Sequence, residues 1–124
     1  MLSGIKSSFD IRHLKRLQRE NSQHKSTSTI ITVPTQRLET ILDTHSVHHV
    51  HYLSIDVEGA EFDVIQSIDF GKVFIDVIGF ENNYADVSEP IVNYLLGKNY
   101  RVLHKGTDIF MIHNQSTFNT KRST

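Results

Sequence analysis

Three carboxylates follow a short apolar run near the middle of the chain. Its apolar residues are Leu53, Ile55 and Val57, and at its end Asp56, Glu58 and Glu61 place three negative charges within six residues. Carboxylates gathered so closely must raise a pKa, attract a cation or diverge into water. A carboxylate can accept a proton from a substrate hydroxyl, and several together can bind a hard cation such as magnesium. The pattern therefore predicts a functional site built from acids.

A strand followed by a helix is the unit that would position these acids. Asp56 falls at the carboxyl edge of the predicted strand, Gly59 permits a sharp turn, and apolar residues recur at helical spacing over about residues 60–68. Ligands of open α/β sheets bind in the crevice outside the strand ends. An acid buried there costs free energy unless it has a partner or a task, so function explains Asp56 best. For Glu61 two interpretations are equally favoured: it is a functional acid, or its charge complements the positive end of the helix dipole.

Turn residues and hydrophobic patterns predict the remaining elements of the domain. These are a β-rich segment at 29–33, a buried strand at 73–80, a helix at about 89–98 capped by Ser88, and a hairpin of two strands at 100–104 and 109–113. Asp76 is the one charged residue inside the predicted strand 73–80. Strand, helix, strand, helix and hairpin in this order predict an α/β fold, with a parallel strand pair joined by a right-handed crossover.

Four histidines form a second group just before the acidic motif: His45, His48, His49 and His51. Imidazoles can bind zinc or another transition metal. The spacing matches no recognisable ligand pattern on a helix, however, and the chain has no cysteine to support a metal site. We therefore interpret this group as a solvated loop, with His51 at the start of a strand. Asp56 and Glu81, at the ends of adjacent predicted strands, form a better pair for magnesium binding or proton transfer.

The composition is that of a soluble globular domain. The 124 residues are 38% hydrophobic and 22% charged, with a formal net charge of −1, which argues against a dedicated nucleic-acid binder. The charge is unevenly distributed, since residues 1–25 carry six Lys and Arg against two acids, and residues 53–89 carry nine acids against Lys72. We interpret a predicted basic helix at about 10–20 as a solvated face rather than a surface for lipid or RNA.

The chain contains no cysteine, so the sequence offers neither a disulfide framework nor a thiol nucleophile. No apolar run approaches the roughly 20 residues of a membrane span, and the first residues lack the apolar core of a signal peptide. We therefore expect a cytoplasmic protein without a membrane span. The expected organisation is a basic helix and polar linker at 1–28, one domain at 29–114 and a polar tail at 115–124.

The acidic motif and the elements around it resemble the FkbM-type methyltransferases, which use S-adenosylmethionine. The motif is Asp56-Val57-Glu58-Gly59-Ala60-Glu61, placed between a strand and a helix. Segments 33–42, 75–82 and 99–102 are similar to the family's preceding helix, next strand and late strand, and Ser3–Ile5 is similar to an upstream segment. The resemblance covers roughly residues 30–114. Ser54 departs from the lysine that many relatives have at this position.

The resemblance implies a fold and a reaction. The fold would be the carboxyl half of a Rossmann-like class I methyltransferase sheet, mostly parallel with a terminal antiparallel hairpin. The reaction would be methyl transfer from S-adenosylmethionine to a hydroxyl group of a small-molecule or glycan acceptor, with no metal ligand among the implied residues. The implied roles are catalysis by Asp56 and Glu81, cofactor binding by Asp56, Glu58 and Gly59, and substrate binding by Glu61 and Asn82.

The Gly-rich turn with which such enzymes hold their cofactor has no counterpart in the sequence. The six glycines, at 4, 59, 71, 79, 97 and 106, are too far apart for a G-x-G pair. We therefore expect a partial domain whose partner is a missing amino-terminal half. Two alternatives remain open: a non-catalytic truncated module that binds a partner, and a small metal hydrolase built on carboxylates.

Overall fold

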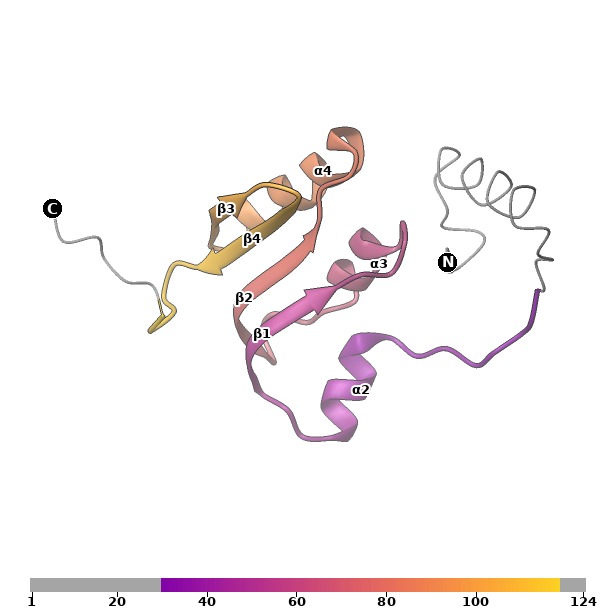
Figure 1. Cartoon of the computed structure of the whole chain (residues 1–124). Helices are drawn as coiled ribbons and strands as arrows, with labels where there is room; N and C mark the ends of the chain where they lie inside the picture. The colour runs from indigo at the N-terminus through magenta and orange to yellow at the C-terminus, as the bar shows by residue number, and fades with distance from the viewer. Residues whose placement is uncertain (1–29, 119–124) are drawn as a thin grey trace, which may run out of the picture.

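The computed structural model describes residues 30–118 as a four-stranded sheet with three helices (Figure 1). The elements are α2 (Leu38–Thr44), β1 (His49–Ile55), α3 (Glu61–Gln66), β2 (Phe74–Glu81), α4 (Ala85–Leu96), β3 (Tyr100–Lys105) and β4 (Asp108–His113). The predicted α/β class is therefore confirmed. The predicted basic helix and linker, the segment Ser3–Ile5 and the tail from residue 119 lie outside the described residues.

The sheet is mixed: the predicted parallel pair and the predicted antiparallel hairpin are both present, but only one of the three strand pairings among the described residues is parallel. The strand order is β1-β2-β4-β3. β1 and β2 pair in parallel from His49↔Phe74 to Ile55↔Phe80, and α3 connects them. The β3–β4 hairpin then places β4 antiparallel to β2, as its register from Val77↔Ile112 to Glu81↔Asp108 shows. The hairpin thus contributes two of the three strand pairings.

The first strand is shifted toward the amino terminus relative to its prediction. It begins at His49 and ends at Ile55, so Asp56 and Val57 lie beyond it. Polar histidines alternate with apolar residues at its start, and this hides the strand from a search for apolar runs. Pairing with β2 determines the boundary, because His49 already lies opposite Phe74. His51 is therefore a strand residue as predicted, but His49 also lies in the strand, and the prediction of a loop that extends through His49 is wrong.

The β-rich segment at 29–33 forms no strand over residues 30–33. Ile30 and Ile31 are each 74% exposed, and the structure pairs this segment with no other strand among the described residues. A β-branched sequence favours a strand only where a neighbouring strand and a buried face are present. The β propensity of these residues was therefore not sufficient to predict a strand.

Helix α4 begins at Ala85, four residues before its predicted start. The carbonyl of Tyr84 accepts hydrogen bonds from the N–H groups of Val87 and Ser88, which starts the helix there. Ser88 does not cap the helix. Its hydroxyl instead donates to Asn82 Oδ1 at 2.7 Å. Pro90 is the sixth residue of the helix, beyond the first turn in which the sequence predicted it, and it provides no backbone N–H for an intrahelical hydrogen bond.

The hydrophobic core lies between the sheet and helices α3 and α4, which both lie behind the sheet in the view of Figure 1. Ile65 of α3 and Leu95 of α4 are fully buried against strand residues that include Ile78 and Met111. Burial of one such side chain contributes about 2 kcal/mol. This layer fixes the strand ends from which the candidate site projects.

Ile78→Ala is expected to lower the free energy of unfolding by about 3 kcal/mol, because it leaves a cavity in the central strand. Ile30→Ala is the matched control. This exposed isoleucine is expected to contribute less than about 0.5 kcal/mol. Urea unfolding followed by circular dichroism measures both values. Equal losses in the two variants would contradict the described core.

Candidate functional site

A sharp turn after β1 carries the acidic motif. Glu58 and Gly59 both have positive φ values, 50° and 101°, so the chain reverses within two residues. Such a conformation strains a residue with a side chain but not glycine. The N–H of Gly59 donates to Glu61 Oε2 at 3.0 Å, and Glu61 is buried at the start of α3. Glu61 therefore orders the turn that precedes it.

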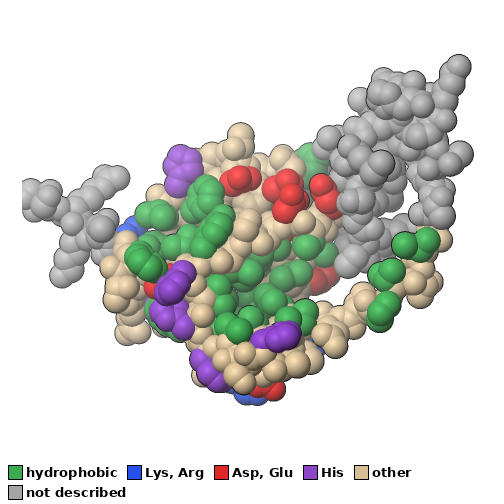
Figure 2. Space-filling view, turned by 60° about the horizontal axis from the view of Figure 1, so that its bottom comes forward, with side chains coloured by type: hydrophobic (Ala, Val, Ile, Leu, Met, Phe, Trp, Pro, Cys, Tyr) green, Lys and Arg blue, Asp and Glu red, His purple; other side chains and the backbone are tan. Residues whose placement is uncertain are grey.

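Three of the predicted acids come together beyond the carboxyl ends of the parallel pair. Asp56, Glu58 and Glu81 each place a carboxylate oxygen within 4.8 Å of those of the other two. We call these three residues the acidic cluster. Figure 2 shows acidic side chains gathered along one edge of the visible face. The register explains the convergence, because Ile55 lies opposite Phe80 and the acids follow directly on both strands.

The environment of Glu81 makes its carboxyl group unusually basic. Burial, followed by the negative charges of Asp56 and Glu58, raises the pKa of Glu81 from 4.5 to about 6. A carboxylate with this pKa is still ionised at neutral pH, and it accepts a proton more readily than an ordinary one. The same three oxygens would suit magnesium, but no further observation supports that ion. Proton acceptance is the chemistry that the arrangement favours.

Asn82 connects three elements behind the acidic cluster. Its side-chain Nδ2 donates to the carbonyl of Gly106 at 3.0 Å, and its Oδ1 accepts from Ser88. Its backbone N–H donates to the carbonyl of Thr107 at 3.0 Å. The side chain is therefore occupied in fixing the hairpin loop and α4 against the end of β2. Asn83 acts closer to the cluster, since its Nδ2 donates to Glu81 Oε2 at 2.7 Å.

A second polar group, which the sequence did not connect, lies near the amino ends of the same strands. Asp76 of β2 is 1% exposed, and His49 Nε2 lies 2.5 Å from its Oδ2. Ser116 donates its hydroxyl hydrogen to Asp76 Oδ1, also at 2.5 Å. Burial alone would raise the pKa of Asp76, but the hydrogen bonds of Ser116 and His49 outweigh it and lower the pKa.

The spacing of this second group could have identified it. His49 and His51 are two residues apart, so they share one face of a strand. The offset of 25 residues between β1 and β2 then brings Asp76 beside them. The histidine pattern was visible in the sequence, but the register was not. His45 and His48 lie before β1 and are exposed.

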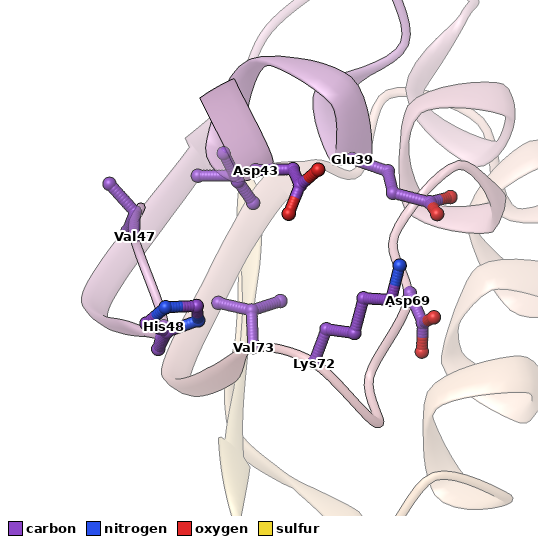
Figure 3. A pocket seen from close by; sticks show the side chains of 8 residues that line it. Glu39, Asp43, Val47, His48, Asp69, Lys72 and Val73 are labelled. Atoms are coloured by element: carbon purple, nitrogen blue, oxygen red, sulfur yellow. The ribbon is translucent and has the colours of Figure 1, made fainter. Parts of the chain in front are cut away.

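A pocket of about 190 Å³ lies between α2 and the turn that precedes β2 (Figure 3). Glu39, Asp69 and Lys72 lie on one side of it, and Val47 and His48 on the other. Because this pocket adjoins the amino ends of β1 and β2, it lies at the opposite end of the strands from the acidic cluster. None of the site residues predicted from sequence lines it.

The comparison with family models identifies the chain. The methyltransferase FkbM domain model matches residues 3–102, so the chain belongs to this family. By family the protein is a methyltransferase, and this class in general uses S-adenosylmethionine. The match includes the segment Ser3–Ile5 that prompted part of the resemblance. No match to the chain was found among curated proteins or among solved structures.

The described helices are not membrane spans. The longest of them, α4, has 12 residues, and none within residues 30–118 is long and apolar enough to cross a bilayer.

Glu81→Gln is expected to raise the unfolding midpoint above that of the wild type at neutral and alkaline pH. Because the pKa of Glu81 is raised in the folded protein, its protonated carboxyl group adds to the free energy of unfolding. This stabilisation is fully present below pH 4.5 and is lost as the pH rises through about 6. The uncharged amide avoids this loss. Thermal unfolding across the pH range measures the difference, with Glu89→Gln, an exposed glutamate of α4, as the control. If the unfolding midpoints of Glu81→Gln and the wild type differed as much below pH 4.5 as at neutral pH, charge repulsion among the three acids would not be the cause.

Proposed function

We propose that the protein forms the carboxyl half of a Rossmann-like methyltransferase that transfers a methyl group from S-adenosylmethionine to a hydroxyl oxygen. The acceptor in this proposal is a small molecule or a glycan. One observation carries it: in a chain of methyltransferase family, three carboxylates converge at the carboxyl ends of a parallel strand pair. This edge is where open α/β sheets bind their ligands.

The chemistry of the donor set fits this cofactor. When bound, S-adenosylmethionine supplies an electrophilic methyl group on a positively charged sulfur. The acidic cluster provides negative charge suited to a cation, and the turn at Gly59 has no side chain to obstruct a ligand. Asp56, Glu58 and Gly59 are the residues that would contact the cofactor in this proposal.

Glu81 is the proposed proton acceptor. Removing the hydroxyl proton makes the acceptor oxygen a better nucleophile, and a carboxylate with a pKa of about 6 is suited to this task. Asp56, which is exposed beside it, would orient the hydroxyl for an in-line approach of about 3 Å. Glu61 and Asn82, proposed from the sequence as substrate ligands, would act here through their hydrogen bonds to the turn and the hairpin.

The cofactor loop is the part of the proposed enzyme that this chain does not supply. No pair of glycines in the sequence has the G-x-G spacing of such a loop. We therefore propose that a separate amino-terminal half provides it and packs beside β1, where the described sheet ends. Such a half would complete the sheet and the cofactor pocket together.

A non-catalytic module that binds a partner is the second candidate function. The observation in its favour is apolar surface: Tyr52 and Leu103 are each 51% exposed. Figure 2 shows hydrophobic side chains spread over the visible face. Tyr52 lies on β1 and Leu103 on β3, the two edge strands of the sheet, and extensive exposed apolar surface often marks an interaction site. The two candidates differ in whether the acidic cluster takes part in a reaction.

The isolated chain is expected to bind S-adenosylmethionine weakly, with a dissociation constant above about 100 µM. The physical reason is that no Gly-rich turn is available to bring backbone N–H groups close to the ligand. Isothermal titration of the purified chain measures this constant. A value near 1 µM, on the order of −8 kcal/mol, would show that the chain builds its cofactor site without a second half.

Glu81→Gln is expected to lower kcat for methyl transfer by about 100-fold, because an amide cannot accept the hydroxyl proton. The assay uses labelled S-adenosylmethionine and a panel of sugars and small alcohols, with a cofactor-binding half of this family supplied as a second chain. Glu89→Gln is the matched control and should leave kcat unchanged. Equal activity in the two variants would remove Glu81 from the proposed mechanism and favour the partner-binding module.

A further inference from the structure

A cluster of nitrogen and oxygen ligands lies near the amino ends of β1 and β2, on residues that the proposed methyl transfer does not use. His49, His51 and Asp76 each offer one ligand atom, and these atoms lie within 4.8 Å of one another. Two imidazoles and one carboxylate form a different donor set from the acidic cluster, which offers only oxygen. We propose that this cluster is a binding site for zinc or a similar divalent transition-metal ion.

The distances are close to those that zinc requires. Zinc binds imidazole nitrogen and carboxylate oxygen at about 2.0–2.2 Å, which spaces tetrahedral ligands about 3.4 Å apart. The three atoms lie within 4.8 Å of one another, and His49 Nε2 and Asp76 Oδ2 are 2.5 Å apart. An ion between them would separate that close pair and draw His51 inward. All three residues lie on the adjacent, paired strands β1 and β2.

The surroundings already hold the ligands in a suitable arrangement. Ser116 donates to Asp76 Oδ1, which leaves the other oxygen directed at His49. Phe74 packs edge-on against the His49 ring, and Phe118 packs edge-on against the His51 ring. Hydrogen bonds to ligating carboxylates and packing around imidazoles are the usual supports of metal ligands.

An ion could reach this site from solvent. Asp76 is 1% exposed, but the side chain of His49 is 52% exposed, and His51 is also exposed. The buried carboxylate therefore forms the floor of the site and the imidazoles form its open side. A water molecule could complete four-coordination there.

The donor set indicates the class of ion. Imidazole nitrogen suits zinc, copper, nickel and cobalt, whereas magnesium and calcium prefer oxygen ligands. A bound ion would link β1 to β2 and, through Ser116, to the segment after β4. Zinc is therefore expected to raise the melting temperature of the chain by mass action.

The test is titration of the chelator-treated chain with zinc chloride, read by calorimetry and by the visible absorption of cobalt used in its place. His51→Ala is the informative variant, because this exposed ring makes no hydrogen bond to Asp76 among the contacts of the described residues. His45→Ala is the matched control, since this exposed histidine lies outside the cluster. Magnesium chloride is the control ion.

The expected result is one zinc ion per chain, bound at least about 100-fold more weakly by His51→Ala and unchanged in His45→Ala. Magnesium should not compete with zinc for this site, and it should not raise the melting temperature through it. Circular dichroism confirms that each variant is folded, and His51→Gln replaces His51→Ala should the latter unfold. Absence of zinc binding by the wild type, or equal affinity in the His51 and His45 variants, would overturn the proposal.

Discussion

The parallel pairing of β1 with β2 is the interaction on which both polar sites depend. Its register runs from His49↔Phe74 to Ile55↔Phe80 and leaves little freedom at either end. At the carboxyl end it brings together acids that are far apart in the sequence. At the amino end it brings Asp76 beside two imidazoles. A shift of one residue would move every side chain of β1 to the other face and dismantle both groups, so the core that fixes the register also fixes the chemistry.

Much of the fold followed from the sequence because its strongest signals were local. The apolar stripe of α3 and the polar residues between β3 and β4 each predicted an element that the structure contains. The errors arose where tertiary pairing outweighs local preference. The β-branched segment ending at Val33 pairs with no strand within residues 30–118, whereas the polar start of β1 pairs with β2. The antiparallel hairpin was predicted, but the order of its strands was not, because the pairing of β4 with β2 is a tertiary contact.

The acidic cluster was partly predictable for the same reason. The acids that end β1 and β2 had to meet once two adjacent parallel strands were inferred, and Asp56 and Glu81 do meet. Hydrogen bonding was beyond the reach of the sequence, which gave no indication that Glu61 binds the N–H of Gly59 or that Asn82 binds the hairpin. Asp76 shows the limit most clearly. A carboxylate inside a predicted buried strand indicates that it has a partner, but only the register of β1 against β2 shows that this partner is His49.

The two polar groups on β2 are electrostatically separate, and this has a consequence for function. Asp76 and Glu81 are five residues apart, or about 16 Å along an extended strand. This separation exceeds the Debye length of about 8 Å at physiological ionic strength, so salt screens exposed charges from one another over such a distance. The charges that raise the pKa of Glu81 all lie at its own end of the sheet, and the groups that lower that of Asp76 lie at the other. A change of charge at one end is therefore expected to leave the protonation of the other end unchanged. The two groups nevertheless depend on the same strand pair, β1 and β2. An ion that held the amino ends of these strands together would therefore affect the acids only by stabilising the strand register.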